Sequence, residues 1–332
     1  MPEVKKILIV RFSSIGDIVL TTPVIRCVRE QTGATVDFLC KQGFKAVVEG
    51  NPYIRNIFTI EKSYLEVAEQ LKRENYDLVL DLQHNLHSWK LKRALGVQSH
   101  SFPKLNIEKW LLVNAKINVL PKLHIVDRYL FTATSLGVGN DGKGLDYFIP
   151  AEQEVNTAKY LSESQSYIAF VIGAAHFTKR LPEEKIIELC KLIPYPVVLL
   201  GGNGEKEIGQ RIAHLSGQHV FNACGKFNLH QSASWVRQAE LVISHDTGLM
   251  HIAAAFQKKI IAVWGNTIPE LGMYPYYRMG NDHYYNAQVT GLTCRPCSKI
   301  GYNKCPKGHF RCMRDMDVQL IAAKVAEMLQ LH

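Results

Sequence analysis

The chain has 332 residues, with 47% hydrophobic and 21% charged side chains and a formal net charge of +9. The length suits about two domains, and the composition is that of a folded globular protein. No run approaches the roughly 18 apolar residues of a membrane span, and the N-terminus lacks the features of a signal peptide, so we expect a cytoplasmic protein. The positive charge is dispersed, which favours a surface for an acidic substrate over a nucleic-acid-binding tail.

Short apolar runs alternate with helical patterns, and the alternation occurs in two series along the chain. Strands that alternate with helices are typical of parallel α/β sheets. We therefore predict an α/β fold with two doubly wound, Rossmann-like domains. The predicted strands are 7–10, 35–39, 57–60 and 78–82 in the first series, and 167–172, 197–201, 241–244 and 260–264 in the second.

The predicted domain boundary lies close to residue 150. Residues 137–144 are rich in glycine and polar side chains and indicate a loop just before it. The expected domains are therefore 1–150 and 151–317. Residues 318–332 have the amphipathic pattern of a C-terminal helix, and one position for this helix is against the first domain.

The first turn with chemically useful side chains follows the first predicted strand and covers residues 11–23. Ligands of open α/β folds bind at the carboxyl ends of the strands, so this turn is a candidate binding loop. Gly16 stands alone, and the absence of a G-x-G-x-x-G fingerprint disfavours a nicotinamide or flavin enzyme. Asp17 begins a predicted helix, where it is either a helix-capping residue or a general base in a cleft.

Two turns of the second series carry groups that suit a nucleotide. Lys179 and Arg180 follow a predicted strand and supply cationic donors of the kind that bind a diphosphate, although a solvated basic loop has the same sequence. Glu205 follows a glycine-rich turn, where a carboxylate suits the hydroxyls of a ribose, although ordinary α/β turns share this pattern. The turns that carry Lys179 and Glu205 are expected at one edge of the second sheet, together with the turn at 264–270.

The most informative turn joins the apolar strand 241–243 to a predicted helix of small residues at 252–256. Such a turn presents free backbone N–H groups at the positive end of a helix dipole, an arrangement that binds phosphate. Asp246 takes the position of the N-cap, and Gly248 allows a ligand to approach the backbone closely. We therefore expect a phosphorylated ligand in the second domain.

Four of the eight cysteines are clustered near the C-terminus. Cys294 and Cys297 form a C-x-x-C pair, and Cys305 and Cys312 follow singly. The cluster permits a structural zinc site, but the second C-x-x-C of a strong zinc motif is absent. A redox-labile pair and packed free thiols remain alternatives, and we expect no catalytic metal.

Taken together, these segments resemble the ADP-heptose:lipopolysaccharide heptosyltransferase family, glycosyltransferase family 9. The resemblance runs unevenly from residue 7 to residue 269. Its most specific parts are Ser-Ser-Ile-Gly-Asp at 13–17 and Asp-Thr-Gly-Leu-Met-His at 246–251, with Thr-Lys-Arg-Leu-Pro at 178–182 a moderate match. The cysteine segment also resembles one found in some members.

The resemblance implies a GT-B fold, in which two Rossmann-like domains face a cleft. It also implies an inverting glycosyl transfer that requires no metal ion. The N-terminal domain would receive the acceptor and the C-terminal domain the ADP-sugar. By this resemblance Asp17 is the general base, and Lys179 and the helix start at Thr247 hold the diphosphate. The residues expected to bind the donor are Thr178, Lys179, Glu205, Asp246, Thr247, Gly248, Leu249 and His251.

The acceptor side is expected in the first domain. Ser14 and Gly16 lie in the same turn as the expected base, and Lys90 and Arg93 belong to a dispersed basic region that suits the phosphates and acidic sugars of a lipid A–core acceptor. The apolar residues 110–113 suit peripheral contact with the cytoplasmic face of the inner membrane, although a core helix with a solvated basic face has the same pattern.

Three other functions remain as alternatives. One is a GT-B enzyme that acts on a different nucleotide sugar, and another is a non-catalytic homologue, which the retention of Asp17 and Lys179 disfavours. The third is a zinc-dependent nucleic-acid-binding protein. Four phosphate-type loops at one sheet edge and the absence of an aromatic-basic stripe argue against nucleic acid as a partner.

Overall fold

The computed structural model describes residues 4–161, 166–280 and 283–330. The contacts divide the chain into two compact units, Met1–Lys104 with Leu123–Phe148, and Leu105–Lys122 with Ile149–His332. None of the helices in the described ranges has the length and apolar character needed to cross a bilayer.

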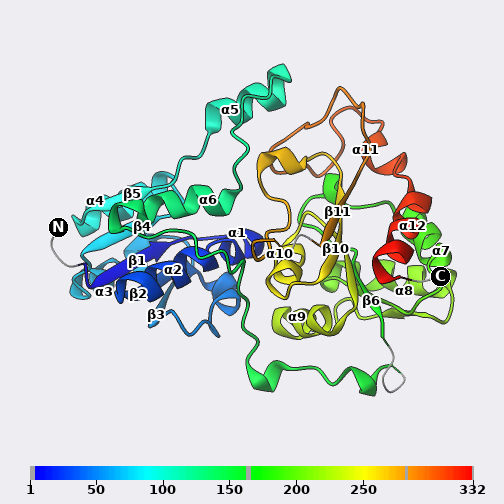
Figure 1. The fold of residues 1–332 in the computed structure, drawn as a ribbon, viewed down its shortest axis with the longest axis horizontal. Coiled ribbons are helices and arrows are strands. Elements are labelled where there is room, and N and C mark those ends of the chain that lie inside the picture. Colours follow the sequence, from blue (N-terminus) through cyan, green and yellow to red (C-terminus); the bar gives the residue numbers. More distant parts are fainter. Residues whose placement is uncertain (1–3, 162–165, 281–282, 331–332) are drawn as a thin grey trace. The chain divides into compact units, whose positions relative to one another are not determined.

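The first unit contains a parallel five-stranded sheet in the order β3-β2-β1-β4-β5 (Figure 1). The chain winds outward from β1 in one direction and then in the other, so the carboxyl end of β1 is the switch point at which open α/β sheets bind ligands. The strands are β1 (Lys6–Val10), β2 (Thr35–Lys41), β3 (Asn56–Ile60), β4 (Leu78–Asp81) and β5 (Ser99–Ser101). The helices are α1 (Ile15–Val19), α2 (Thr22–Thr32), α3 (Ala68–Arg73), α4 (Leu86–Leu95) and α6 (Ile125–Leu130).

The second unit contains a parallel six-stranded sheet in the order β11-β10-β9-β6-β7-β8. Its winding direction reverses between β6 and β9, which places the switch point at the carboxyl ends of these two strands. The strands are β6 (Ile168–Val171), β7 (Val197–Leu200), β8 (Val220–Asn222), β9 (Leu241–His245), β10 (Lys259–Trp264) and β11 (Tyr284–Gln288). The helices are α5 (Asn106–Trp110), α7 (Glu183–Leu192), α8 (Lys206–Ser216), α9 (Leu229–Gln238), α10 (Gly248–Ala255), α11 (Arg311–Arg314) and α12 (Val318–Leu329).

The eight predicted strands are all present, and the three that were not predicted are edge strands. β5 lies at one edge of the first sheet, and β8 and β11 lie at the two edges of the second. Strands inside a parallel sheet are covered on both faces and therefore read as apolar runs, whereas β5 has the polar sequence Ser-His-Ser and β11 the sequence Tyr-Tyr-Asn-Ala-Gln. The prediction of two doubly wound α/β units is confirmed.

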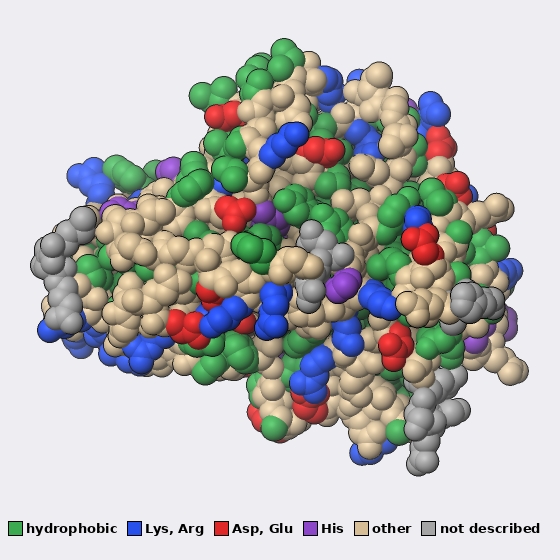
Figure 2. Space-filling view, in the orientation of Figure 1, with side chains coloured by type: hydrophobic (Ala, Val, Ile, Leu, Met, Phe, Trp, Pro, Cys, Tyr) green, Lys and Arg blue, Asp and Glu red, His purple; other side chains and the backbone are tan. Residues whose placement is uncertain are grey.

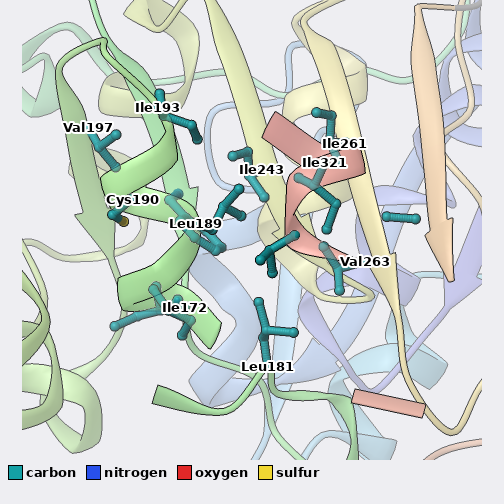
Figure 3. Close-up of a cluster of buried hydrophobic side chains, with 14 of the residues drawn as sticks. Ile172, Leu181, Leu189, Cys190, Ile193, Val197, Ile243, Ile261, Val263 and Ile321 are labelled. Atoms are coloured by element: carbon teal, nitrogen blue, oxygen red, sulfur yellow. The ribbon is translucent and has the colours of Figure 1, made fainter. Parts of the chain in front are cut away.

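The C-terminal helix α12 packs on the second unit. Val318, Ile321 and Val325 are buried in the same hydrophobic cluster as side chains of α7, β9 and β10. Figure 3 shows Ile321 next to Ile261 of β10. The amphipathic face expected from the sequence is therefore present, and it covers the second sheet.

Residues 105–122 belong to the second unit by their contacts, although they lie within the expected first domain, 1–150. The Lys116 Nζ donates hydrogen bonds to the carbonyl oxygens of Cys294 and Pro296, at 3.1 and 2.7 Å. These groups are about 180 residues away in the chain. Contacts of such long range have no local sequence signal, so neighbouring residues do not reveal to which unit this segment belongs.

Replacement of Ile321 tests the position of α12. We predict that Ile321→Ala lowers the free energy of unfolding of the second unit by about 2–5 kcal/mol, because it leaves a cavity in the core. Chemical denaturation followed by circular dichroism measures the effect. Leu320→Ala is the matched control, since Leu320 is exposed on the same helix. Equal losses for the two variants would contradict the packing.

Candidate functional site

The switch point of the second sheet brings two loops side by side. β6 and β9 are hydrogen-bonded neighbours, with Val171 in register with Ser244. The loop at 173–182 leaves β6, and the turn at 246–248 leaves β9. Segments about 70 residues apart in sequence therefore meet at one sheet edge, as the sequence analysis expected for its phosphate-type loops.

An ion pair joins these two loops. The Lys179 Nζ lies 2.6 Å from the Asp246 Oδ2 and 3.3 Å from the carbonyl oxygen of Asp246. The hydroxyl of Thr267, in the turn after β10, donates to the same Oδ2 at 3.1 Å. The side chains of Lys179 and Asp246 are only 15% and 9% exposed, so solvent screens this pair less than it screens a surface pair. Removal of either charge would leave the other one poorly solvated.

The N-cap of α10 is Thr247, so the prediction that Asp246 caps this helix is wrong. The carboxylate is instead occupied by Lys179 and Thr267. The Thr247 side chain makes no capping hydrogen bond, and its hydroxyl lies 3.2 Å from the Ser244 hydroxyl. The first turn of α10 therefore has N–H groups without a side-chain cap at its positive end, next to an ammonium group. This combination suits an anion.

The other residues expected in the α10 turn differ in accessibility. Gly248 and Leu249 form the first turn of α10 and are half-buried. His251 lies in the next part of the helix with 1% of its surface exposed. The first turn is thus only partly covered, whereas His251 belongs to the packed side of α10.

Thr178 anchors the loop that carries Lys179. Its hydroxyl donates to the carbonyl oxygen of Tyr302 at 3.1 Å and accepts the Tyr302 N–H at 2.8 Å. Because the side chain is buried and both of these bonds are internal, Thr178 contributes to the site through loop position.

Glu205 and Arg180 form a second link at this sheet edge. Glu205 Oε1 lies 3.1 Å from Arg180 Nη1, and its Oε2 accepts the Gly202 N–H at 3.0 Å. A Cβ atom at Gly173 would lie 3.0 Å from Oε2, closer than ordinary contact, so glycine makes room for this carboxylate. Arg180 was expected to be a ligand for a diphosphate, but in this structure it faces Glu205.

His245, a residue with no role expected from the sequence, connects the same two loops. It is the last residue of β9 and is fully buried. Its Nε2 accepts the Leu181 N–H at 2.9 Å, so the ring proton is on Nδ1. Burial lowers the pKa of His245 to about 4, which keeps the ring neutral at physiological pH. A polar residue at the end of an apolar strand was the available sequence signal.

In the first unit, the turn after β1 holds Asp17 in a capping box. Asp17 Oδ2 accepts hydrogen bonds from the Ser14 N–H at 3.2 Å and from the Ser14 hydroxyl at 2.8 Å. Its Oδ1 lies 2.7 Å from Arg11 Nη2. Of the two roles that the sequence left open, helix capping is thus observed, and the carboxylate retains partial exposure at the switch point.

Arg11 is itself fixed by the backbone. Its Nε donates to the carbonyl oxygen of Ser13 and its Nη1 to that of Leu82. Burial lowers the pKa of Arg11, but the nearby Tyr129 and Asp17 outweigh this effect and raise it. Arg11 therefore remains a cation and holds the Asp17 carboxylate in one orientation.

The basic residues of α4 fall into two groups. Lys90 and Arg93 are exposed, with the Arg93 guanidinium 4.9 Å from the ring centre of Trp89. Lys92 points inward and lies 2.8 Å from the buried carboxylate of Asp81. The exposed pair, together with Ser14 and Gly16 of the α1 turn, was expected to bind an acceptor, and only Gly16 of these four is buried.

The cysteine cluster does not form a metal centre in the described part of the chain. Cys294, Cys297, Cys305 and Cys312 are free thiols, and no three His, Cys, Asp or Glu side chains among the described residues are arranged to hold a metal. Burial raises the pKa of Cys297 to about 11 and that of Cys312 to about 12, so both groups are protonated thiols when no metal is bound. The arrangement of the described residues gives the zinc alternative no support.

Comparison with known proteins identifies similar chains. Residues 64–298, more than half of the chain, match the sequence model of glycosyltransferase family 9 (heptosyltransferase). Lipopolysaccharide heptosyltransferase 1 of Campylobacter coli is 25% identical over 288 residues, which cover 79% of this chain and 84% of the relative.

Solved structures share the fold. A glycosyltransferase family 9 protein from Veillonella parvula superposes with a TM-score of 0.77 at 22% identity, with 98% of both chains covered. The Escherichia coli heptosyltransferase WaaC with ADP superposes with a TM-score of 0.63 at 26% identity, with 80% of this chain and 88% of that chain covered. The expected GT-B fold class, with two parallel-sheet α/β domains, is confirmed.

Replacement of His245 tests whether this neutral histidine links the loops. In wild type the folded-state pKa of about 4 lies below the ordinary value of 6.5, so protonation favours the unfolded chain and stability falls as the pH drops from about 6.5 towards 4. We predict that His245→Gln, which keeps an acceptor but does not titrate, shows a smaller loss between pH 7 and pH 5 in denaturant unfolding. Parallel pH profiles for the two proteins would contradict a buried neutral His245.

Proposed function

As a member of glycosyltransferase family 9, the heptosyltransferase family, the chain is a glycosyltransferase, and we propose that it transfers a heptose from ADP-heptose to a lipopolysaccharide inner-core acceptor with inversion at the anomeric carbon. The observation that carries the proposal is the Lys179–Asp246 pair beside the uncapped start of α10, at the switch point of the second sheet.

The donor's diphosphate is assigned to Lys179 and the first turn of α10. As the sugar leaves, negative charge develops on the β-phosphate, and an ammonium group and helix N–H groups that are already in place stabilise that charge. Thr247, Gly248 and Leu249 would supply the backbone donors, and Asp246 would lie near the sugar. This binding mode supplies cationic stabilisation from the chain's own residues.

Other parts of the donor are assigned to residues around the diphosphate site. Glu205 would accept hydrogen bonds from the ribose hydroxyls, with Arg180 and Gly202 holding its carboxylate. Thr178 and His251 would support the site through the position of the loop and of α10, since both side chains are buried.

Asp17 is the proposed general base. A sugar hydroxyl is a weak nucleophile, and a positioned carboxylate assists it by accepting its proton as the new bond forms. The hydroxyl oxygen forms a bond to the anomeric carbon while the bond from that carbon to the β-phosphate oxygen breaks. The electron pair of the broken bond leaves with ADP. Arg11 and Ser14 would keep the carboxylate oriented towards the hydroxyl.

The acceptor is proposed to be the lipid A–core oligosaccharide, bound by the first unit. Lys90 and Arg93 are exposed cations that suit its phosphate and carboxylate groups, and Ser14 and Gly16 would line the site near Asp17. Such an acceptor would place the protein at the cytoplasmic face of the inner membrane. The curated heptosyltransferase relatives support this acceptor class.

The direct experiment combines the purified protein with ADP-heptose and a series of truncated lipopolysaccharide acceptors. Release of ADP and a product heavier by one heptose unit are the expected results. Parallel reactions with UDP-, GDP- and other ADP-sugars test the alternative that a different nucleotide sugar is the donor. Turnover of one of these sugars but not of ADP-heptose would overturn the proposal.

Replacement of Asp17 separates chemistry from binding. Asp17→Asn is nearly isosteric but cannot accept the proton, so we predict a loss in kcat of about 10²–10⁴-fold with the affinity for ADP-heptose nearly unchanged. Steady-state kinetics and isothermal titration calorimetry measure the two quantities. Near-normal turnover would remove Asp17 from the mechanism.

Replacement of Lys179 is predicted to affect the donor. Lys179→Ala removes the ammonium group from the phosphate site and should weaken ADP-heptose binding and lower turnover, each by tenfold or more. Lys185→Ala is the matched control, since Lys185 pairs with Glu188 of the same helix, α7, and not with Asp246. Melting temperatures of both variants show whether loss of the Asp246 partner unfolds the protein. Unchanged donor affinity in a folded Lys179→Ala variant would contradict the assignment.

A further inference from the structure

Large apolar side chains are exposed together on the segment 105–122. Ile107 and Trp110 of α5 are 74% and 60% exposed, and Ile117 and Val119, which follow the helical part, are 54% and 51% exposed. Ile107 and Trp110 are three residues apart and therefore share a helix face. Figure 2 shows hydrophobic side chains gathered over α5 at the top of the view. We name Ile107, Trp110, Ile117 and Val119 the α5 patch.

The α5 patch stands on an ordered support. Leu112, from the opposite side of the same helical segment, is buried. The Lys116 ammonium group bonds to the carbonyl oxygens of Val113, Cys294 and Pro296 and so fixes the end of the segment to the second unit. One face of the segment is therefore packed while the other holds apolar side chains in solvent, and such an exposed patch is typical of a binding surface.

The charge around the α5 patch is positive. Within residues 105–122, three lysines oppose the single carboxylate of Glu108, which leaves a net charge of +2. Lys116 is bonded to backbone carbonyl oxygens, so Lys109 and Lys122 are the lysines proposed to meet headgroups. Apolar side chains with a tryptophan, bordered by lysines, match the boundary between lipid headgroups and acyl chains, where the rings enter the interface and the cations meet anionic headgroups. A second copy of the chain would bring the same positive charge to the contact.

We propose that the α5 patch docks the protein on an anionic phospholipid bilayer. This inference rests on the proposed function only for the identity of the membrane, because a lipid-linked acceptor requires the enzyme to work at a bilayer. Binding to lipid vesicles is measured with neither donor nor acceptor present. A failure of vesicle binding can therefore be distinguished from a failure of the proposed transferase activity.

The test is co-sedimentation of the full chain with vesicles of phosphatidylglycerol and phosphatidylethanolamine, and with vesicles of phosphatidylcholine alone. We expect binding to the anionic vesicles that weakens with salt, and much weaker binding to phosphatidylcholine. Ile107→Asn with Trp110→Ser should weaken binding by tenfold or more, since each removed side chain loses its transfer from water to the bilayer. The matched control is Leu192→Asn with Leu215→Asn, which removes two exposed apolar side chains of the same unit elsewhere.

Two further measurements compare the wild type with the Ile107→Asn, Trp110→Ser variant, called the patch variant: transferase activity and the state of self-association. The patch variant should keep its thermal stability and its activity on a delipidated, water-soluble acceptor while losing activity on acceptor presented in vesicles. Failure of the wild type to bind anionic vesicles, or equal binding by wild type and patch variant, would overturn the proposal. A wild-type dimer in sedimentation velocity that the patch variant abolishes would assign the α5 patch to self-association and would also overturn it.

Discussion

The ion pair between Lys179 and Asp246 is the interaction on which the candidate donor site depends. It joins the loop after β6 to the turn after β9, with Thr267 as a third contributor from the turn after β10. Because both side chains are largely buried, each charge needs the other to remain in place. The pair places the Lys179 ammonium group, balanced by the Asp246 carboxylate, next to the start of α10. In the proposed mechanism this ammonium group and the helix N–H groups stabilise the departing diphosphate.

Supporting side chains keep the loops of this site in position. His245 accepts the Leu181 N–H from within the sheet, and Thr178 bonds to the backbone of Tyr302. In the first unit, the Arg11 guanidinium holds the Asp17 carboxylate in position. In each case a buried side chain bonds to the backbone or to a carboxylate and fixes the position of a loop at a strand end. Such preorganisation is what catalysis by charge stabilisation and proton transfer requires, since no group then has to reorganise during the reaction.

Local sequence was sufficient to predict the features that neighbouring residues determine, namely the apolar strands and the turns that follow them. The apolar runs predicted the inner strands and the edge strand β3, because strand burial is set by neighbouring residues. The residues after β1, β6 and β9 predicted loops that are candidates for ligand binding. Asp246 was predicted to be an N-cap from its neighbours in sequence. Its carboxylate instead bonds to Lys179, 67 residues earlier. The contacts of Lys116, the packing of α12 and the role of His245 likewise arise from pairs distant in sequence, for which a single sequence carries no local signal.

The most direct measurement of the central claim is a crystal structure of the protein with ADP-heptose or a non-reactive analogue. If Lys179 and α10 form the diphosphate site, the β-phosphate oxygens will lie within hydrogen-bonding distance of the Lys179 Nζ and of the first N–H groups of α10. The Glu205 carboxylate will then contact the ribose. A diphosphate bound away from both Lys179 and the start of α10 would contradict the claim.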